Sequence, residues 1–460
     1  MLDNGGVTIR SRWKPWLLRL VPIVLLAVYY CYLATRVGLD SGGSAGPDEI
    51  ARMLVPKAML NGKLIPSGYD PDTILGWGNY SYAFYPQMLG SYVTAACMAV
   101  ARVFGAAPLA QLYAARMSSV LWGLVGACCV GSTVSTLILP RERSQEYGAI
   151  ATLFIGFWPQ YAFLSAYVNN DIVGLAGVSM LVCALVKGVK NQWNFKSSAL
   201  LVAGIVICAL GYLNTYGFIL AGIVVFVTSC VSQNRENRRR ALTMIGLSAA
   251  ACAILTFPFY AVNIARYGDP IGSRAFQAQY DKWVLDGGKP LMVPYSAGAF
   301  NMLFRDSRFV KLTTKSIIGF FGYITSPLPD VFIFFFGGSL LVGTVLFFCN
   351  RPYVRSAFSN RWRLFTVSMI IATLITVCLH IWRSVTTDFQ PQGRYIIDIL
   401  VPWCIVAVLG FTGSSRKTSP YMWLFIVVYV AACVVGMSLV MKDWPGLAAS
   451  PTEWLTLVIP

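Results

Sequence analysis

Hydrophobic runs, each about 20 residues long, recur along the whole 460-residue chain and alternate with shorter polar segments. A run of this length can cross the hydrocarbon core of a bilayer as one helix. The pattern predicts an all-α polytopic membrane protein with about 11 transmembrane helices in a single integral membrane domain, residues 1–460. The predicted spans are 15–36, 112–138, 147–164, 172–188, 198–213, 215–232, 243–264, 331–349, 364–382, 395–413 and 420–441.

The distribution of basic residues predicts the orientation. If residues 87–104 are not counted as a span, every basic cluster in a short connection falls on one side, as expected for cytoplasmic loops. We therefore expect residues 87–104 to form an amphipathic helix on the outer membrane surface. The N-terminus is then cytoplasmic, and the tail from Lys442 is extracytoplasmic. The clusters comprise Arg141 and Arg143; Lys187, Lys190 and Lys196; Arg235, Arg238, Arg239 and Arg240; Arg351, Arg355, Arg361 and Arg363; and Arg416 and Lys417.

This topology leaves two long outer loops, 37–110 and 265–330, and two short polar ones at 167–171 and 386–395. The loop 265–330 carries several basic residues, although it is predicted to lie outside. Long loops escape the charge rule, so these residues give only weak support for an anionic ligand. They are Arg266, Arg274, Lys282, Lys289, Arg305, Arg308, Lys311 and Lys315.

The composition excludes several classes of protein. Hydrophobic residues make up 57% and charged residues 12% of the chain, whereas soluble domains carry roughly 25% charged residues. The net charge of +17 does not indicate nucleic-acid binding, because the basic residues lie in short segments between apolar runs. The twelve cysteines fall almost entirely inside apolar runs and therefore predict buried thiols. A single histidine, His380, argues against a histidine-based metal centre.

The N-terminus has an alternative interpretation as a cleaved signal peptide. Four basic residues precede the first apolar run, and residues 43–45 offer a possible cleavage region. The apolar run is long for a signal peptide, which favours a retained first span. The basic residues are Arg10, Arg12, Lys14 and Arg19.

Gly46, Pro47, Asp48 and Glu49 stand just beyond the first predicted span and place two adjacent carboxylates there. Pro47 suits the first position of a helix, because its missing N–H would be unpaired there anyway. Ionised carboxylates in a first helical turn interact favourably with the helix dipole. The pair therefore has two interpretations: it caps a helix, or it belongs to an outward-facing catalytic site.

An arginine opens the predicted span 395–413 on the same outer side. Arg394 follows Gln392 and Gly393, and a helix N-terminus with an arginine is suited to a phosphate. Gly393 would let the backbone approach such a ligand closely. The alternatives for Arg394 are a position at the membrane interface and an ion pair with Asp398 one turn later.

Asn169, Asn170 and Asp171 precede the predicted span 172–188 on that side as well. Asp171 would cap a helix or contact a ligand, and the two asparagines suit a turn equally well. Together, the outer motifs predict a site with a carboxylate base and a phosphate clamp. Nucleotide sugars are cytoplasmic, so the expected phosphate is that of a lipid.

An ordered set of motifs resembles the GT-C superfamily of integral membrane glycosyltransferases, and within it a bacterial group of multi-span membrane proteins with a first-loop Pro-Asp-Glu motif. The resemblance covers most of the chain, and each motif alone is weak. One position departs from the pattern, because Arg52 stands where the family often has a histidine after the acidic pair. The matching motifs are Pro47–Glu49, Ala115–Ser118, Val168–Asp171, Tyr267–Pro270, Gly319–Tyr323 with Pro327–Pro329, and Gln392–Tyr395.

The resemblance implies transfer of a sugar from a polyprenyl-phosphate or polyprenyl-diphosphate donor to a glycan, lipid or protein acceptor at the outer face of the cytoplasmic membrane. Asp48 is then the base that deprotonates the acceptor, with inversion at the anomeric carbon. Glu49 would hold the acceptor or tune Asp48. Arg394 would neutralise the leaving phosphate, with Arg116 as a second candidate. The other expected substrate-binding residues are Gln392, Tyr395, Asn169, Asn170 and Asp171.

No cofactor is assigned from the sequence, and a divalent cation near Asp171 and the phosphate is the one candidate. A transporter or flippase of lipid-linked saccharides is the alternative function, because it would also need an arginine-lined phosphate site and many spans. Transporters often show inverted repeats and ionisable groups within the spans, which this sequence does not display. A catalytically inactive scaffold is a third possibility, against which the intact Asp48 and Glu49 argue.

Overall fold

The structure is a computed structural model that describes residues 15–39, 46–138, 141–413 and 420–460. It is nearly all helical, and its only described strands form a two-stranded antiparallel hairpin in which Phe320 pairs with Pro327 and Phe321 with Ser326. The helices and strands are α1 (Pro15–Arg36), α2 (Glu49–Leu60), α3 (Leu89–Val103), α4 (Pro108–Leu137), α5 (Arg141–Gly156), α6 (Pro159–Leu164), α7 (Asp171–Asn191), α8 (Phe195–Gly211), α9 (Tyr216–Gln233), α10 (Arg238–Tyr267), α11 (Ser273–Leu285), α12 (Gly298–Phe300), α13 (Arg308–Gly319), β1 (Phe320–Phe321), β2 (Ser326–Pro327), α14 (Asp330–Cys349), α15 (Arg351–Ala357), α16 (Arg363–Thr386), α17 (Leu400–Thr412), α18 (Pro420–Met441) and α19 (Thr452–Val458).

Nine helices of the described residues are long and apolar enough to cross a membrane, so the protein is a multi-pass membrane protein. All eleven predicted apolar runs are helical, but α8 and the helices of 147–164 are shorter than a full span, and the count of about 11 is not confirmed. The α7 segment is 89% buried, whereas the α10 segment is only 6% buried. An apolar helix with as little protein contact as α10 is suited to face lipid. The high burial of α7 places this helix at the centre of the bundle.

Two predicted spans are built from two pieces each. The segment 147–164 divides where α5 ends and Pro159 begins α6, because proline holds the preceding Trp158 in an extended conformation (φ −68°, ψ 122°). The segment 395–413 begins with a 3₁₀ helix, Gly393–Ile399, that continues into α17. Both interruptions lie next to the candidate site, where they aim side chains that a continuous α-helix would point elsewhere.

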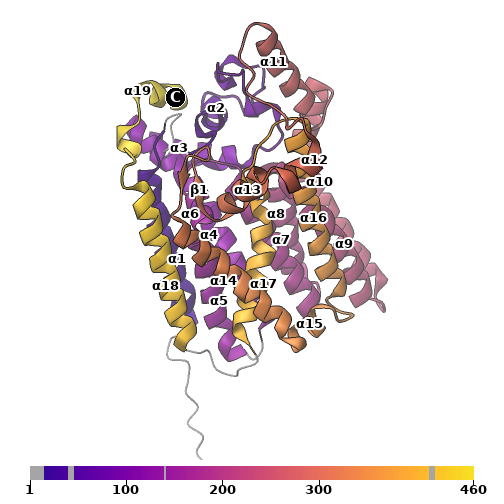
Figure 1. The fold of residues 1–460 in the computed structure, drawn as a ribbon. Coiled ribbons are helices and arrows are strands. Elements are labelled where there is room, and N and C mark those ends of the chain that lie inside the picture. Colours follow the sequence, from indigo (N-terminus) through magenta and orange to yellow (C-terminus); the bar gives the residue numbers. More distant parts are fainter. Residues whose placement is uncertain (1–14, 40–45, 139–140, 414–419) are drawn as a thin grey trace, which may run out of the picture.

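The helices of the predicted outer loops gather at one end of the bundle. Figure 1 shows α2, α3, α11, α12, α13 and α19 at this end, while α15, which carries part of a basic cluster, lies at the opposite end. The arrangement agrees with a surface position for α3. Arg10, Arg12, Lys14, Arg416 and Lys417 lie outside the described residues, as does the segment 43–45.

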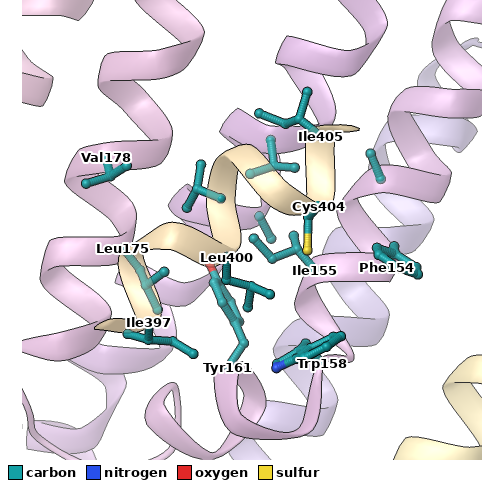
Figure 2. Packing of buried hydrophobic residues seen from close by; sticks show 14 of the residues in the cluster. Phe154, Ile155, Trp158, Tyr161, Leu175, Val178, Ile397, Leu400, Cys404 and Ile405 are labelled. Carbon is teal, nitrogen blue, oxygen red and sulfur yellow. The ribbon is translucent and has the colours of Figure 1, made fainter. Parts of the chain in front are cut away.

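A close-packed core supports the site end. Buried side chains of α5, α6, α7 and α17 interdigitate around the 3₁₀ segment that carries Ile397, and Figure 2 shows Leu175, Trp158 and Tyr161 beside it. The indole N–H of Trp158 donates to the carbonyl of Ile317 at 2.6 Å, which ties α6 to α13. The functional motifs are thus attached to packed helices rather than to free loops.

Candidate active site

Asp48 lies at the start of α2 in a conformation that is unusual for a residue with a side chain. Its φ of 65° is in the left-handed region, which costs energy unless the surroundings hold it. The N–H of Asp48 donates to the hydroxyl of Tyr323 at 2.9 Å. Gly46 lies against the ring of Tyr167, and a Cβ at this position would come within 2.3 Å of that ring. The turn therefore depends on a glycine, on Tyr167 and on the β1–β2 hairpin.

The helix begins two residues later than Pro47 predicted. Glu49 is its first residue, and the side chain of Asp48 makes no capping hydrogen bond within the described helix. Asp48 therefore occupies the N-cap position, where its carbonyl accepts from the N–H of Arg52 at 3.0 Å, but its side chain does not cap the helix. The left-handed turn instead directs the two adjacent carboxylates to different partners.

Asp48 and Arg394, 346 residues apart, form an ion pair. Nη2 of Arg394 donates to Oδ2 of Asp48 at 3.0 Å. The guanidinium is fixed from two other sides, because its Nε donates to Gln392 at 2.8 Å and its Nη2 to the hydroxyl of Tyr395 at 3.0 Å. The side chain of Arg394 is 5% exposed and that of Asp48 is 26% exposed. The alternative pairing of Arg394 with Asp398 does not occur, because both carboxylate oxygens of Asp398 lack a hydrogen-bond partner in the described residues.

The electrostatics of the site keep Asp48 ionised. Burial alone would raise the pKa of this carboxyl, but the guanidinium groups of Arg394 and Arg52 lower the pKa below its usual value. The hydroxyl of Tyr82 acts in the same direction. Burial and the charge of Asp48 raise the pKa of Tyr323 to about 12, so its hydroxyl stays protonated at neutral pH.

Gly393 serves packing rather than the predicted approach to a ligand. A Cβ on this residue would come within 2.3 Å of the backbone nitrogen of Ile317 in α13. Its N–H donates to the hydroxyl of Ser316. The glycine thus lets the 3₁₀ helix pack directly on α13 and fixes the position of the neighbouring Arg394.

Glu49 and Arg116 form a second ion pair, which is fully buried. Nη2 of Arg116 donates to Oε2 of Glu49 at 2.6 Å and its Nε to Oε1 at 2.9 Å. The remaining donors of Arg116 reach three backbone carbonyls, and Oε1 of Glu49 also accepts from the N–H of Val168 at 2.9 Å. With these contacts, Glu49 and Arg116 tie α2 to α4 and to the turn before α7, and neither faces the Asp48–Arg394 pair. The carbonyls are those of Ala34, Val37 and Gly38.

The polar residues of the turn before α7 have different surroundings, since one stabilises the turn and another lines a cavity. The amide nitrogen of Asn169 donates to the carbonyls of Leu164 and Tyr167, both at 2.7 Å, so this side chain holds the turn. Asn170 is half-buried and lines a cavity. Asp171 is 1% exposed, and neither of its oxygens accepts a hydrogen bond of ordinary geometry from the described residues. The negative charge of Asp171 nevertheless interacts electrostatically with the guanidinium groups of Arg52 and Arg394.

Arg52, Tyr82 and Tyr323 belong to the site, although sequence reasoning did not assign them a role. The Cζ atom of Arg52 lies 4.1 Å from the centre of the Tyr82 ring, at a distance typical of cation–π contacts. Burial would lower the pKa of Arg52, but Tyr82, followed by the charges of Asp48 and Asp171, raises the pKa above its usual value. The departure at position 52 from the histidine of the GT-C pattern was the signal that could have identified this residue.

Two cavities are lined by residues near Asp48 in the sequence, Pro47 in one and Arg52 in the other, and Asp48 itself lines neither. One is lined by Arg394, Gln392, Ser316 and Tyr167 together with Pro47. The phenolic oxygen of Tyr167 is buried and has no hydrogen-bond partner in the described structure. The other cavity opens beside Arg52, one helical turn after Asp48.

The described residues contain no group of three or more histidine, cysteine, aspartate or glutamate side chains that could hold a metal ion. A cation bound by protein side chains alone does not fit this set of donors. Mg²⁺ commonly uses one or two carboxylates together with substrate phosphate, and Asp171 and Asp398 are the buried carboxylates that have no hydrogen-bond partner in the described residues.

Comparison with solved structures identifies the fold. The apo oligosaccharyltransferase of Archaeoglobus fulgidus aligns with a TM-score of 0.51 and 13% sequence identity, over 95% of this chain and 57% of that protein. The two proteins share a fold. ArnT from Cupriavidus metallidurans, solved with bound undecaprenyl phosphate, aligns with a TM-score of 0.47 and 16% identity, over 92% of this chain and 63% of that protein.

The comparison confirms the predicted fold class, an all-α polytopic membrane protein whose helices are arranged as in this oligosaccharyltransferase. The chain spans about 57–63% of the length of these two proteins. No protein-family model matches the sequence, and no curated protein sequence matches it.

Proposed function

We propose that this protein is a membrane glycosyltransferase that moves a sugar from a polyprenyl-(di)phosphate donor to a glycan, lipid or protein acceptor at the outer face of the cytoplasmic membrane. The observation that carries the proposal is the Asp48–Arg394 ion pair, which joins a carboxylate to a fixed guanidinium at one end of a membrane bundle. The fold shared with an oligosaccharyltransferase is compatible with this chemistry.

The donor phosphate occupies the cavity lined by Arg394. Its oxygens accept from the guanidinium, as in other phosphate sites built on arginine, and from the unpartnered hydroxyl of Tyr167. A phosphate there replaces Asp48 as a partner of Arg394. The carboxylate then loses its closest cation while its burial persists, and its pKa rises, which makes Asp48 a stronger base.

In the transfer step, the acceptor hydroxyl oxygen attacks the anomeric carbon from the side opposite the phosphate. The acceptor proton passes to Asp48, and the C–O bond to the phosphate breaks with its electron pair leaving on the phosphate oxygen. Arg394 stabilises the negative charge that develops there. One displacement inverts the anomeric centre without a covalent enzyme intermediate. Glu49 and Arg116 position α2 and take no part in the displacement.

The first test measures binding of undecaprenyl phosphate to the purified protein in nanodiscs. Arg394→Ala should weaken binding roughly 10-fold or more, because it removes a charge-assisted contact of about 1.5–3 kcal/mol. The control is Arg308→Ala, since this side chain is 70% exposed and pairs only with Asp306 among the described residues. Equal affinities of both variants and the parent protein would exclude Arg394 as the phosphate ligand.

The second test measures transfer from polyprenyl-phosphate and polyprenyl-diphosphate sugars in the same preparation. Asp48→Asn should abolish transfer and leave undecaprenyl phosphate bound. A flippase would instead move lipid-linked sugar across proteoliposomes without forming a new glycosidic bond. That outcome would contradict the proposal.

A further inference from the structure

Two thiols meet across the interface between α4 and α7, away from the candidate site. Cys129 of α4 and Cys183 of α7 are in side-chain hydrogen-bonding contact, and both are free thiols. Each lies eight residues before the end of its helix. Since both helices begin at the site end of the bundle, the pair lies about two turns from the opposite end.

Contacts on either side of the thiols hold the two helices together. Gly126 lies so close to α7 that a Cβ on it would come within 3.3 Å of the Cα of Ala176. Further along, the side chain of Lys190 donates to the backbone carbonyl of Thr136. Thr136 and Lys190 each follow the cysteine of their helix by seven residues, which is about two turns and returns to the same helix face. The packing therefore directs both cysteines toward this interface.

The side chain of Cys183 packs into a depression on α4. Its sulfur is in hydrogen-bonding contact with the side chains of Cys129, Ser132 and Thr133, which stand at positions i, i+3 and i+4 and so form neighbours on one helix face. The hydroxyl of Thr133 also donates to the carbonyl of Cys129 at 2.8 Å. A side chain held among three such neighbours cannot move away from Cys129 without separating the helices.

The surroundings of the pair suit thiol oxidation. Cys183 is 1% exposed, whereas Cys129 is only half-buried and can be reached by a small oxidant. Lys187, one turn further along α7, places a positive charge near both sulfurs, as is common around reactive cysteines. Disulfides need Cα atoms ~4.4–6.8 Å apart, and the contact of Gly126 with Ala176 shows that the two backbones approach this closely.

We propose that Cys129 and Cys183 are an oxidisable pair, which hydrogen peroxide converts into a reversible disulfide between α4 and α7. The sulfur of Cys129 attacks one oxygen of the peroxide, the O–O bond breaks, and the other oxygen leaves as water with the thiol proton. The sulfur of Cys183 then attacks the resulting sulfenic acid, and the S–O bond breaks as a second water leaves with the proton of Cys183. One peroxide is thus reduced by two electrons for each disulfide formed.

The disulfide fastens two helices that both extend to the candidate site, because α4 carries Arg116 and α7 begins at Asp171. The end of the bundle near the thiols is the one that the basic clusters predict to be cytoplasmic. Disulfides of the reducing cytoplasm are usually transient and respond to oxidants, which agrees with a reversible link. This proposal does not depend on the proposed transferase function.

The test exposes the full chain in nanodiscs to hydrogen peroxide, blocks the remaining thiols with iodoacetamide, and maps the digested protein by mass spectrometry. The parent protein should yield two peptides joined through Cys129 and Cys183, which dithiothreitol separates. Cys129→Ser and Cys183→Ser should each yield no such product. Cys128→Ser is the matched control and should retain it, because Cys128 is also half-buried but is rotated by about 100° around α4 from Cys129.

Thermal unfolding, followed by tryptophan fluorescence, gives a second measurement. Oxidation should raise the midpoint by roughly 2–5 °C in the parent protein and in Cys128→Ser, and dithiothreitol should reverse the shift. Cys349, which is exposed, reports that the peroxide has acted. Oxidation of Cys349 without linkage of Cys129 to Cys183 would overturn the proposal, and so would a fully linked protein whose unfolding midpoint is unchanged.

Discussion

Replacing Glu49 distinguishes a structural carboxylate from a catalytic one. In Glu49→Gln the side chain keeps its size, but the buried Arg116 loses its only carboxylate partner among the described residues. The new amide group also points a donor toward the donors of Arg116. We expect the free energy of unfolding to fall by about 3–5 kcal/mol, the usual cost of removing one partner of a buried ion pair. Glu453→Gln, an exposed glutamate of α19, should change it by less than about 0.5 kcal/mol.

The magnitude follows from the contacts of both partners. Glu49 accepts three hydrogen bonds, two from Arg116 at 2.9 and 2.6 Å and one from Val168 at 2.9 Å. Arg116→Met leaves the carboxylate buried without its cation and should cost a similar amount. The double variant should be no less stable than the worse single variant, which gives a coupling of at least about 3 kcal/mol.

The assay is reversible unfolding in mixed micelles, with the transfer rate measured on the folded fraction. We expect Glu49→Gln to keep transfer per folded molecule within about 10-fold of the parent protein, because Glu49 contacts no reacting group. A Glu49→Gln protein as stable as Glu453→Gln, but without transfer, would refute the reasoning and return Glu49 to the catalytic residues.

Three other expectations concern the chemistry of the site. Arg394 and Arg52 lower the pKa of Asp48 before the donor binds. The acid limb of kcat/KM, which reports the free protein, should therefore lie at lower pH than the acid limb of kcat, which reports the donor complex. Coincident limbs in a pH series from 4 to 8 would contradict the proposal that phosphate displaces Asp48 from Arg394. Because the pKa of Asp48 is lowered in the folded state, the stabilisation from the Asp48–Arg394 ion pair should be present above the unfolded pKa of about 3.9 and lost only as the pH falls below that value. An Asp48→Asn protein with an unchanged acid unfolding profile would argue against a stabilising ion pair. Tyr323→Phe removes the hydrogen bond to the Asp48 N–H and should lower kcat up to about 10-fold, with little change in donor affinity; an unaltered kcat would show that the turn holds without it. EDTA should reduce transfer by less than about 10-fold, because a cation held by Asp171 would only assist Arg394 in stabilising the phosphate. A complete loss of transfer that Mg²⁺ or Mn²⁺ restores would show that the cation is essential.

The order of spans and loops was predictable, because it depends on properties that are local in sequence. Length and hydropathy predicted the apolar helices, and the basic clusters separated the two ends of the bundle. Pro159 marks the interruption between α5 and α6 in the sequence, although the hydropathy of 147–164 predicts one continuous span. The failure at Pro47 is instructive, since its propensity for the first helical turn was overridden by the packing of Gly46 on Tyr167.

The grouping of the site was only partly predictable. The sequence predicts that Asp48 and Arg394 belong to one site, but only the three-dimensional structure shows the direct contact between them. Adjacency could not separate Asp48 from Glu49, because the left-handed backbone at Asp48 decides where each side chain points. Arg116 has the composition of a phosphate ligand, and only its burial against Glu49 revealed a different role.

The helix that carries the acidic motif is completed by a segment almost 400 residues downstream. Lys57 in α2 donates to the carbonyls of Thr456 and Leu457, at 3.2 and 2.8 Å, and Val458 packs in one cluster with Met53. Figure 1 shows α19 beside α2 at the site end of the bundle. During synthesis, α2 therefore leaves the membrane insertion machinery long before its packing partner exists. The protein should acquire an ordered α2 only after α19 has been synthesised, and nascent chains stopped before that point should expose α2 to proteases.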